Sequence, residues 1–195
     1  MALSTLERER QWNLPNLLTY GRMVAVPAVA GCLFAPDDLR MRWLALAIFA
    51  VAGVTDFFDG YLARAWNQQS SLGRMLDPIA DKLLVAASLL MLVADHSVTS
   101  WSIWAAIVIL CREILVSGLR EFLAELRVSV PVTRVAKWKT TAQLAAIGFL
   151  IAGPAGETVL PGTIAIGLVL LWIAAVLTLY TGWDYMKAGF RPVAE

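Results

Sequence analysis

Four aspartates that lie close together in the sequence are the residues best suited to chemistry. Asp56 and Asp59 are three residues apart, and Asp77 and Asp81 are four residues apart. In helices, each pair would therefore lie on one face. Both pairs adjoin long apolar segments, where ionisable side chains are costly and usually functional. We expect the two pairs to converge from neighbouring helices.

Four carboxylates that converge in a medium of low dielectric repel one another unless cations neutralise them. Oxygen ligands without a nearby histidine or cysteine favour hard ions such as Mg²⁺ or Mn²⁺ over zinc. Two such ions would balance four acids. A two-metal carboxylate site beside basic residues is typical of displacement at phosphorus, because the metals orient the phosphate oxygens and neutralise their charge.

The composition places these acids in a membrane protein. Of the 195 residues, 59% are hydrophobic and only 16% are charged, unlike an ordinary soluble domain. A helix needs about 20 residues to cross the hydrocarbon core. The alternative, a soluble helical bundle, is disfavoured because helices of such bundles keep polar faces. We predict an all-α integral membrane fold with six transmembrane helices, over residues 16–35, 41–65, 73–94, 100–122, 133–153 and 159–185.

Lysine and arginine are divided unevenly between the two sides of the predicted bundle. Of the sixteen, only Arg40 and Arg42 fall on one side, and an excess of these residues marks the cytoplasmic side. We therefore expect both termini and the aspartates to face the cytoplasm. The net charge of +1 gives no electrostatic argument for nucleic-acid binding.

The first residues of the chain do not resemble a signal peptide, because residues 1–13 mix acids with bases and no apolar core follows. A capping-box pattern, Ser4 to Glu7, predicts a short helix that could lie in the membrane interface. The sequence shows no internal repeat, low-complexity tract or soluble domain, so residues 1–195 are predicted to form a single membrane domain with an N-terminal juxtamembrane segment.

Polar side chains also recur on the first predicted span. Asn16, Thr19 and Arg22 follow one another at steps of three, so they would form a polar stripe on one helical face. An amide, a hydroxyl and a guanidinium together would suit a nucleotide or phosphate. A helix cap and an arginine that extends to the membrane surface would explain the same residues.

Basic residues also occur on the fourth and fifth predicted spans. Arg112 and Arg120 would lie within about 80° of each other around a helix, whereas Lys137 and Lys139 would point about 200° apart. A general excess of lysine and arginine on the cytoplasmic side would account for the basic residues in the loop between these spans. It accounts less well for an Arg112–Glu113 pair inside a helix.

The sixth predicted span has no charged residue before Asp184. We expect it to serve mainly in packing, with Trp183 and Tyr185 as anchors at the membrane interface.

The region from Asp56 to Asp81 reads Asp-x2-Asp-Gly-x2-Ala-Arg-x8-Gly-x3-Asp-x3-Asp. This is the signature of the CDP-alcohol phosphotransferases, and every fixed position matches, so the chain resembles that family. Residues 13–22, 112–121 and 137–143 are similar to the corresponding segments of its bacterial phosphatidylglycerophosphate synthases. The resemblance implies six transmembrane helices, usually in a homodimer of the bacterial inner membrane, and a polar cavity open to the cytoplasm.

The resemblance also implies a reaction. A phosphatidyl group would pass from CDP-diacylglycerol to glycerol 3-phosphate, giving phosphatidylglycerophosphate and CMP. Asp56, Asp59 and Asp77 would bind two Mg²⁺ or Mn²⁺ ions, while Asp81 would share one ion and act as the general base. The residues expected to bind the nucleotide are Gly60, Ala63, Arg64 and Gly73, assisted by Asn16 and Thr19. Those expected to bind the phosphate of the acceptor are Arg112, Arg120 and Lys137, with Lys139 less directly.

Other functions agree with part of this pattern. Within the family, the acceptor could be inositol phosphate, serine or another alcohol. Cationic side chains favour a phosphorylated acceptor, and only the resemblance decides between glycerol and inositol phosphates. A cation transporter would also line a membrane cavity with acids, but these acids cluster near one side and no second half repeats them. The acids could, finally, do no more than solvate helix ends.

Overall fold

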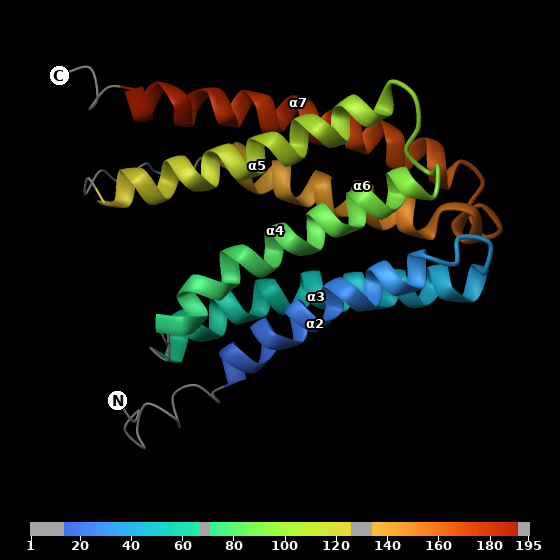
Figure 1. The fold of residues 1–195 in the computed structure, drawn as a ribbon, viewed down its shortest axis with the longest axis horizontal. Helices are drawn as coiled ribbons and strands as arrows, with labels where there is room; N and C mark the ends of the chain where they lie inside the picture. The colour runs from blue at the N-terminus through green and yellow to red at the C-terminus, as the bar shows by residue number, and fades with distance from the viewer. Residues whose placement is uncertain (1–13, 67–70, 126–133, 191–195) are drawn as a thin grey trace. The chain divides into compact units, whose positions relative to one another are not determined.

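The computed structural model describes residues 14–66, 71–125 and 134–190, and almost all of these residues are helical (Figure 1). Large apolar side chains such as Val24, Ile114 and Val176 are exposed along these helices, as expected for a surface that meets lipid. The helices within these ranges are α2 (Leu14–Leu33), α3 (Leu39–Trp66), α4 (Ser71–Ala94), α5 (Ser102–Glu125), α6 (Arg134–Glu157) and α7 (Thr163–Phe190).

The prediction of an all-α chain is confirmed. Each predicted span coincides with one of the described helices, and the boundaries differ by five residues or fewer. Within the residues that the structure describes, two helices are long and apolar enough to cross a membrane by length and composition, over Ser102–Glu125 in α5 and Thr163–Lys187 in α7. The expected short helix within residues 1–13 lies outside the described residues.

Side-chain caps set the boundaries of two helices. Asp38 precedes α3, and its Oδ1 accepts a hydrogen bond of 2.9 Å from the backbone N–H of Arg40, as at a helix N-cap. Before α7, the carboxylate of Glu157 accepts from the N–H groups of Gly162 at 2.7 Å and Ile164 at 2.9 Å. Each carboxylate thereby satisfies a backbone donor in the first turn of its helix, that of Arg40 in α3 and that of Ile164 in α7.

Helix α6 contains a kink. Gly153 has φ 42° and ψ −125°, and Pro154 follows it. A proline has no N–H to donate and disfavours the helical conformation of the residue before it. Glycine adopts a positive φ without steric cost, so the helix changes direction here and continues to Glu157.

The chain forms two compact units, Met1–Met91 and Leu92–Glu195. In the first, α2 packs along α3, and small buried residues such as Ala25 and Ala52 let the two helices approach. In the second, α7 packs along both α5 and α6. A Cβ atom added to Gly167 of α7 would lie only 2.8 Å from Leu150 Cγ of α6, so the contact between these helices depends on this glycine.

Candidate active site

In the first unit, the polar stripe predicted on α2 is buried. Asn16, Thr19 and Arg22 are each exposed by 2% or less. They lie at steps of three within one helix, so the structure places them together on an inward face. This agrees with the predicted stripe and shows that Arg22 does not extend to the membrane surface.

Two residues of this stripe hold the aspartates of α4. The Thr19 hydroxyl donates to Asp77 Oδ1, and Arg22 Nη1 donates to Asp81 Oδ1 at 2.7 Å. The side chain of Arg22 is 1% exposed and that of Asp81 is 44% exposed. The buried cation therefore fixes one oxygen of a carboxylate that still reaches solvent. This arrangement can orient Asp81 for binding a metal ion or accepting a proton.

The other predicted residues of this site are described less fully. Asp56, Asp59, Gly60, Ala63 and Arg64 all lie within α3, but their side chains fall outside the described part of the chain. Gly73 of α4 is buried.

Of the four acids of the predicted metal site, only the side chains of Asp77 and Asp81 are described, and Asp56 and Asp59 stay predictions from the sequence. Among the described side chains, no group of three or more His, Cys, Asp or Glu residues gathers around a common point. The groups that are described, the Asp77 and Asp81 carboxylates with the Thr19 hydroxyl, offer oxygen donors alone. Such a donor set fits Mg²⁺ or Mn²⁺.

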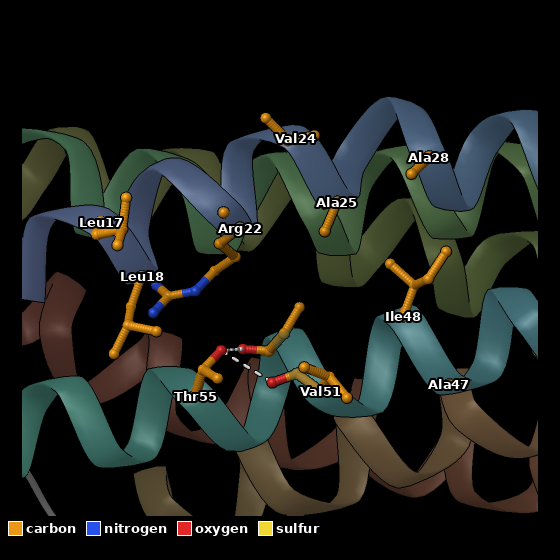
Figure 2. Close-up of a pocket in the computed structure, with 12 residues that line it drawn as sticks. Leu17, Leu18, Arg22, Val24, Ala25, Ala28, Ala47, Ile48, Val51 and Thr55 are labelled. Carbon is orange, nitrogen blue, oxygen red and sulfur yellow. Dashed lines mark hydrogen bonds between the residues drawn. The ribbon is translucent and has the colours of Figure 1, made fainter. Parts of the chain in front are cut away.

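An apolar groove of about 480 Å³ lies between α2 and α3 beside this cluster. Figure 2 shows Leu17, Leu18 and Val24 of α2 and Ile48 of α3 around it, with the guanidinium of Arg22 directed into the space between the two helices. The one other polar side chain of its lining, Thr55, donates to backbone carbonyls of its own helix. The groove can accommodate hydrocarbon, and a charged group at Arg22.

In the second unit, a carboxylate is shared by two cations. Glu113 Oε1 accepts from Lys139 Nζ of α6 and lies 3.4 Å from Arg112 Nη1. The side chains of Glu113 and Lys139 are 18% and 8% exposed. Because burial weakens screening by solvent, these contacts are stronger than pairs on a surface. Glu113 thus links α5 to α6.

Arg112 is held by α7 as well. Its Nη2 donates to Thr181 Oγ1 at 2.9 Å, and the Thr181 hydroxyl in turn donates to the backbone carbonyl of Leu177. The guanidinium carbon lies 5.9 Å from the centre of the Tyr185 ring. Within the described residues, Arg112 Nε is buried and has no hydrogen-bond partner.

The remaining predicted basic residues differ in their surroundings. Arg120 is exposed, and its guanidinium carbon lies 5.6 Å from the same Tyr185 ring. Lys137 is also exposed. Lys139, which the helical angle ranked below Lys137, is the lysine that is buried beside Glu113 and Arg112. Arg112 is thus connected to Lys139 through Glu113 and to Arg120 through the Tyr185 ring. Lys137 is exposed and lies outside this cluster.

The sequence analysis did not single out Thr181, and it assigned neither the contact of Glu113 with Lys139 nor that of Tyr185 with the arginines. The prediction that Tyr185 is an anchor at the membrane interface is wrong, because Tyr185 is only 6% exposed and is therefore buried inside the protein. Trp183 is 60% exposed, with Lys187 Nζ 5.4 Å from the centre of its ring. The sequence signal available for Thr181 and Tyr185 was their spacing of four residues, which places them on one helical face.

Comparisons with known proteins agree with the pattern in the sequence. Residues 12–180 match the family model of the CDP-alcohol phosphatidyltransferases. The chain is 47% identical over 176 residues to the CDP-diacylglycerol–glycerol-3-phosphate 3-phosphatidyltransferase of Rickettsia typhi, covering 90% of this chain and 96% of the relative. It is 41% identical over 209 residues to the protein of the same name from Cereibacter sphaeroides (90% and 95% covered). The similarity to that from Shigella flexneri is 41% over 180 residues (91% and 95%).

Proposed function

The chain belongs to the CDP-alcohol phosphatidyltransferase family, and from this membership we infer that it transfers a phosphatidyl group from CDP-diacylglycerol to glycerol 3-phosphate. The products are phosphatidylglycerophosphate and CMP, so the enzyme acts in phospholipid biosynthesis. The observation that carries this assignment is the 41–47% identity, over nine-tenths of the chain, to proteins named for that activity.

Asp81 is the proposed general base. It takes the proton from the attacking hydroxyl of glycerol 3-phosphate, and that oxygen then bonds to the phosphorus that carries diacylglycerol. The bond from this phosphorus to the oxygen of CMP breaks, and CMP leaves with the bonding electron pair. The contact of 2.7 Å from Arg22 supports the role, because it holds the carboxylate in one orientation while leaving it accessible.

Asp56, Asp59, Asp77 and Asp81 would together hold two Mg²⁺ or Mn²⁺ ions. When bound, the ions would neutralise the charge of the phosphate oxygens. The oxygen-only donors of Asp77 and Asp81 support this proposal, and so does the hydroxyl of Thr19, which orients Asp77.

The nucleotide of the donor is proposed to lie against a set of small and polar residues. Three of these, Asn16, Thr19 and Gly73, are buried. Thr19 donates a hydrogen bond to Asp77, and Gly73 lies four residues before Asp77 in α4, which supports a compact polar pocket. Small residues leave room for a flat group against the backbone. The full proposed set is Asn16, Thr19, Gly60, Ala63, Arg64 and Gly73.

The phosphate of the acceptor is proposed to bind in the second unit, at Arg112, Arg120 and Lys137. The exposure of Arg120 and the position of both guanidinium groups over the Tyr185 ring support this assignment, because guanidinium groups bind phosphate oxygens through several donors at once. Lys139 contributes its charge from beside Glu113.

The helical fold and the family identify a membrane protein. We propose further that residues 1–195 form one membrane domain that crosses the bacterial inner membrane six times and works as a homodimer. The distribution of lysine and arginine supports placing the termini and the active site on the cytoplasmic side.

The test is a panel of acceptors with purified protein and CDP-diacylglycerol, scored by CMP release and by product mass. Glycerol 3-phosphate should be the preferred acceptor. Turnover with inositol phosphate or serine instead would reassign the acceptor within the family, and cation transport without CMP release would exclude the transferase.

A further inference from the structure

The ring of Tyr185 is shared by the two arginines of the proposed acceptor site. The guanidinium carbons of Arg112 and Arg120 lie 5.9 Å and 5.6 Å from its centre. Both distances are within the range of a cation–π contact. The tyrosine comes from α7 and the arginines from α5, so the contact joins residues that are far apart in the sequence.

Arg112 is confined by the same face of α7. Thr181 accepts its hydrogen bond at 2.9 Å, and a Cβ atom added to Gly182 would lie 3.1 Å from Arg112 Cγ. The side chain therefore passes close over the glycine backbone before it reaches the ring. Thr181, Gly182 and Tyr185 together leave the guanidinium little freedom of orientation.

Arg120 depends more heavily on the ring. It lies on the exposed side of α5, and among the described residues it forms no ion pair and donates no hydrogen bond. An exposed arginine without such contacts samples many rotamers and loses that entropy when it binds a ligand. Contact with a buried ring limits the rotamers in advance, so less is lost on binding.

We propose that Tyr185 is a positioning residue for the phosphate of glycerol 3-phosphate, acting through Arg112 and Arg120. Two guanidinium groups against one ring bring like charges together, which is unfavourable until an anion lies beside both. A phosphate dianion supplies that charge and enough oxygen acceptors for both groups. This inference rests on the proposed function, because it concerns the acceptor of that reaction.

The experiment compares steady-state kinetics of Tyr185→Leu, Tyr185→Phe and the wild type, with each substrate varied in turn. Leucine removes the ring, and we expect the KM for glycerol 3-phosphate to rise about tenfold, while the KM for CDP-diacylglycerol stays close to that of the wild type. Phenylalanine keeps the ring and should recover most of the loss. Leu171→Ala, a buried site elsewhere on α7, is the control: it should lower the melting temperature without separating the two KM values.

A double-mutant cycle tests whether Tyr185 acts through the arginines. In an Arg120→Ala background, Tyr185→Leu should raise the KM for glycerol 3-phosphate by a smaller factor than in the wild type, because one of its partners is already gone. Equal factors in both backgrounds would overturn the proposal, and so would equal changes in the two KM values. A wild-type protein that releases no CMP with glycerol 3-phosphate would instead refute the proposed function itself.

Discussion

Replacing Glu113 with glutamine removes a negative charge that two largely buried cations share. Glu113 Oε1 accepts from Lys139 Nζ and lies 3.4 Å from Arg112 Nη1. Glutamine has nearly the same shape and can still accept a hydrogen bond, so the change is electrostatic. Lys139 and Arg112 would then repel each other without compensation inside the second unit. We expect a large loss of stability.

The size of this loss follows from the geometry. At 3.4 Å and an effective dielectric of about 20, the attraction between Arg112 and Glu113 is about 5 kcal/mol. The contact with Lys139 adds to this, but removal of the carboxylate also removes its own desolvation cost, of several kcal/mol. The net cost of breaking such a buried network is about 3–5 kcal/mol. For a chain of this length, that corresponds to a fall of roughly 6–20 °C in melting temperature.

The assay is thermal unfolding of the detergent-solubilised protein, followed by tryptophan fluorescence. Glu125→Gln is the matched control, because Glu125 is an exposed acid on the same helix; its melting temperature should stay at that of the wild type. The double variant Glu113→Gln/Lys139→Met should recover part of the loss, because it removes one of the uncompensated cations.

A ligand experiment then connects stability to function. If the acceptor's phosphate binds at Arg112, it supplies the negative charge that Glu113→Gln removes. Glycerol 3-phosphate should therefore raise the melting temperature more in this variant than in the wild type, by linkage. A Glu113→Gln protein as stable as the Glu125→Gln control would refute the electrostatic reasoning. An equal response to glycerol 3-phosphate in variant and wild type would remove the phosphate from this cluster.

Further predictions concern the first unit and the cap of α7. Arg22→Met should lower the rate of CMP release about 10- to 100-fold, since a hydrogen bond to a charged group contributes about 1.5–3 kcal/mol, and Arg22→Lys should lower it less; equal losses would contradict a directional role for the guanidinium. Asp81→Asn should abolish turnover but largely spare binding of CDP-diacylglycerol, and an active variant would exclude Asp81 as the base. EDTA should stop CMP release and added Mg²⁺ or Mn²⁺ should restore it, whereas turnover in metal-free buffer would refute the metal site. Hydrogen bonds from the backbone N–H groups of Ile164 and Gly162 lower the pKa of Glu157 from its ordinary value of 4.5. Its stabilising contribution is therefore complete above pH 4.5 and is lost as the pH falls through the lowered pKa, so the difference in melting temperature between the wild type and Glu157→Gln should shrink only in acid.

The helices could be predicted from the sequence because each follows from a local pattern, an apolar run between polar ends. The prediction differed where a tertiary feature intervened. The fifth span was expected to end at residue 153, where a proline follows, but α6 continues to Glu157 because Gly153 adopts a positive φ. The conformation of Gly153, which lets the helix continue past Pro154, does not follow from the apolar pattern and appeared only in the structure.

The site was predictable within helices and not between them. The stripe of Asn16, Thr19 and Arg22 follows from the helical period alone. The contact between Arg22 and Asp81 joins residues 59 positions apart, so it depends on how α2 is rotated against α4. Likewise, the rotation of α6 about its own axis decides that Lys139 is buried while Lys137 is exposed. Helical angles gave the difference between the two lysines but not which of them faces inward.

Burial decides which charge each unit presents, although both units use the same kinds of side chain. In the first, the buried partner is a cation, Arg22, and the accessible one is the carboxylate of Asp81, at 1% and 44% exposure. In the second, Glu113 is enclosed by Lys139 and Arg112, so one positive charge remains in excess and Arg120 adds another. The first arrangement suits metal ions and a transferred proton, and the second suits a phosphate dianion. If this reasoning holds, exchanging the charges at Arg22 and Asp81 should preserve their pairing but abolish turnover, because the accessible group would then be a cation.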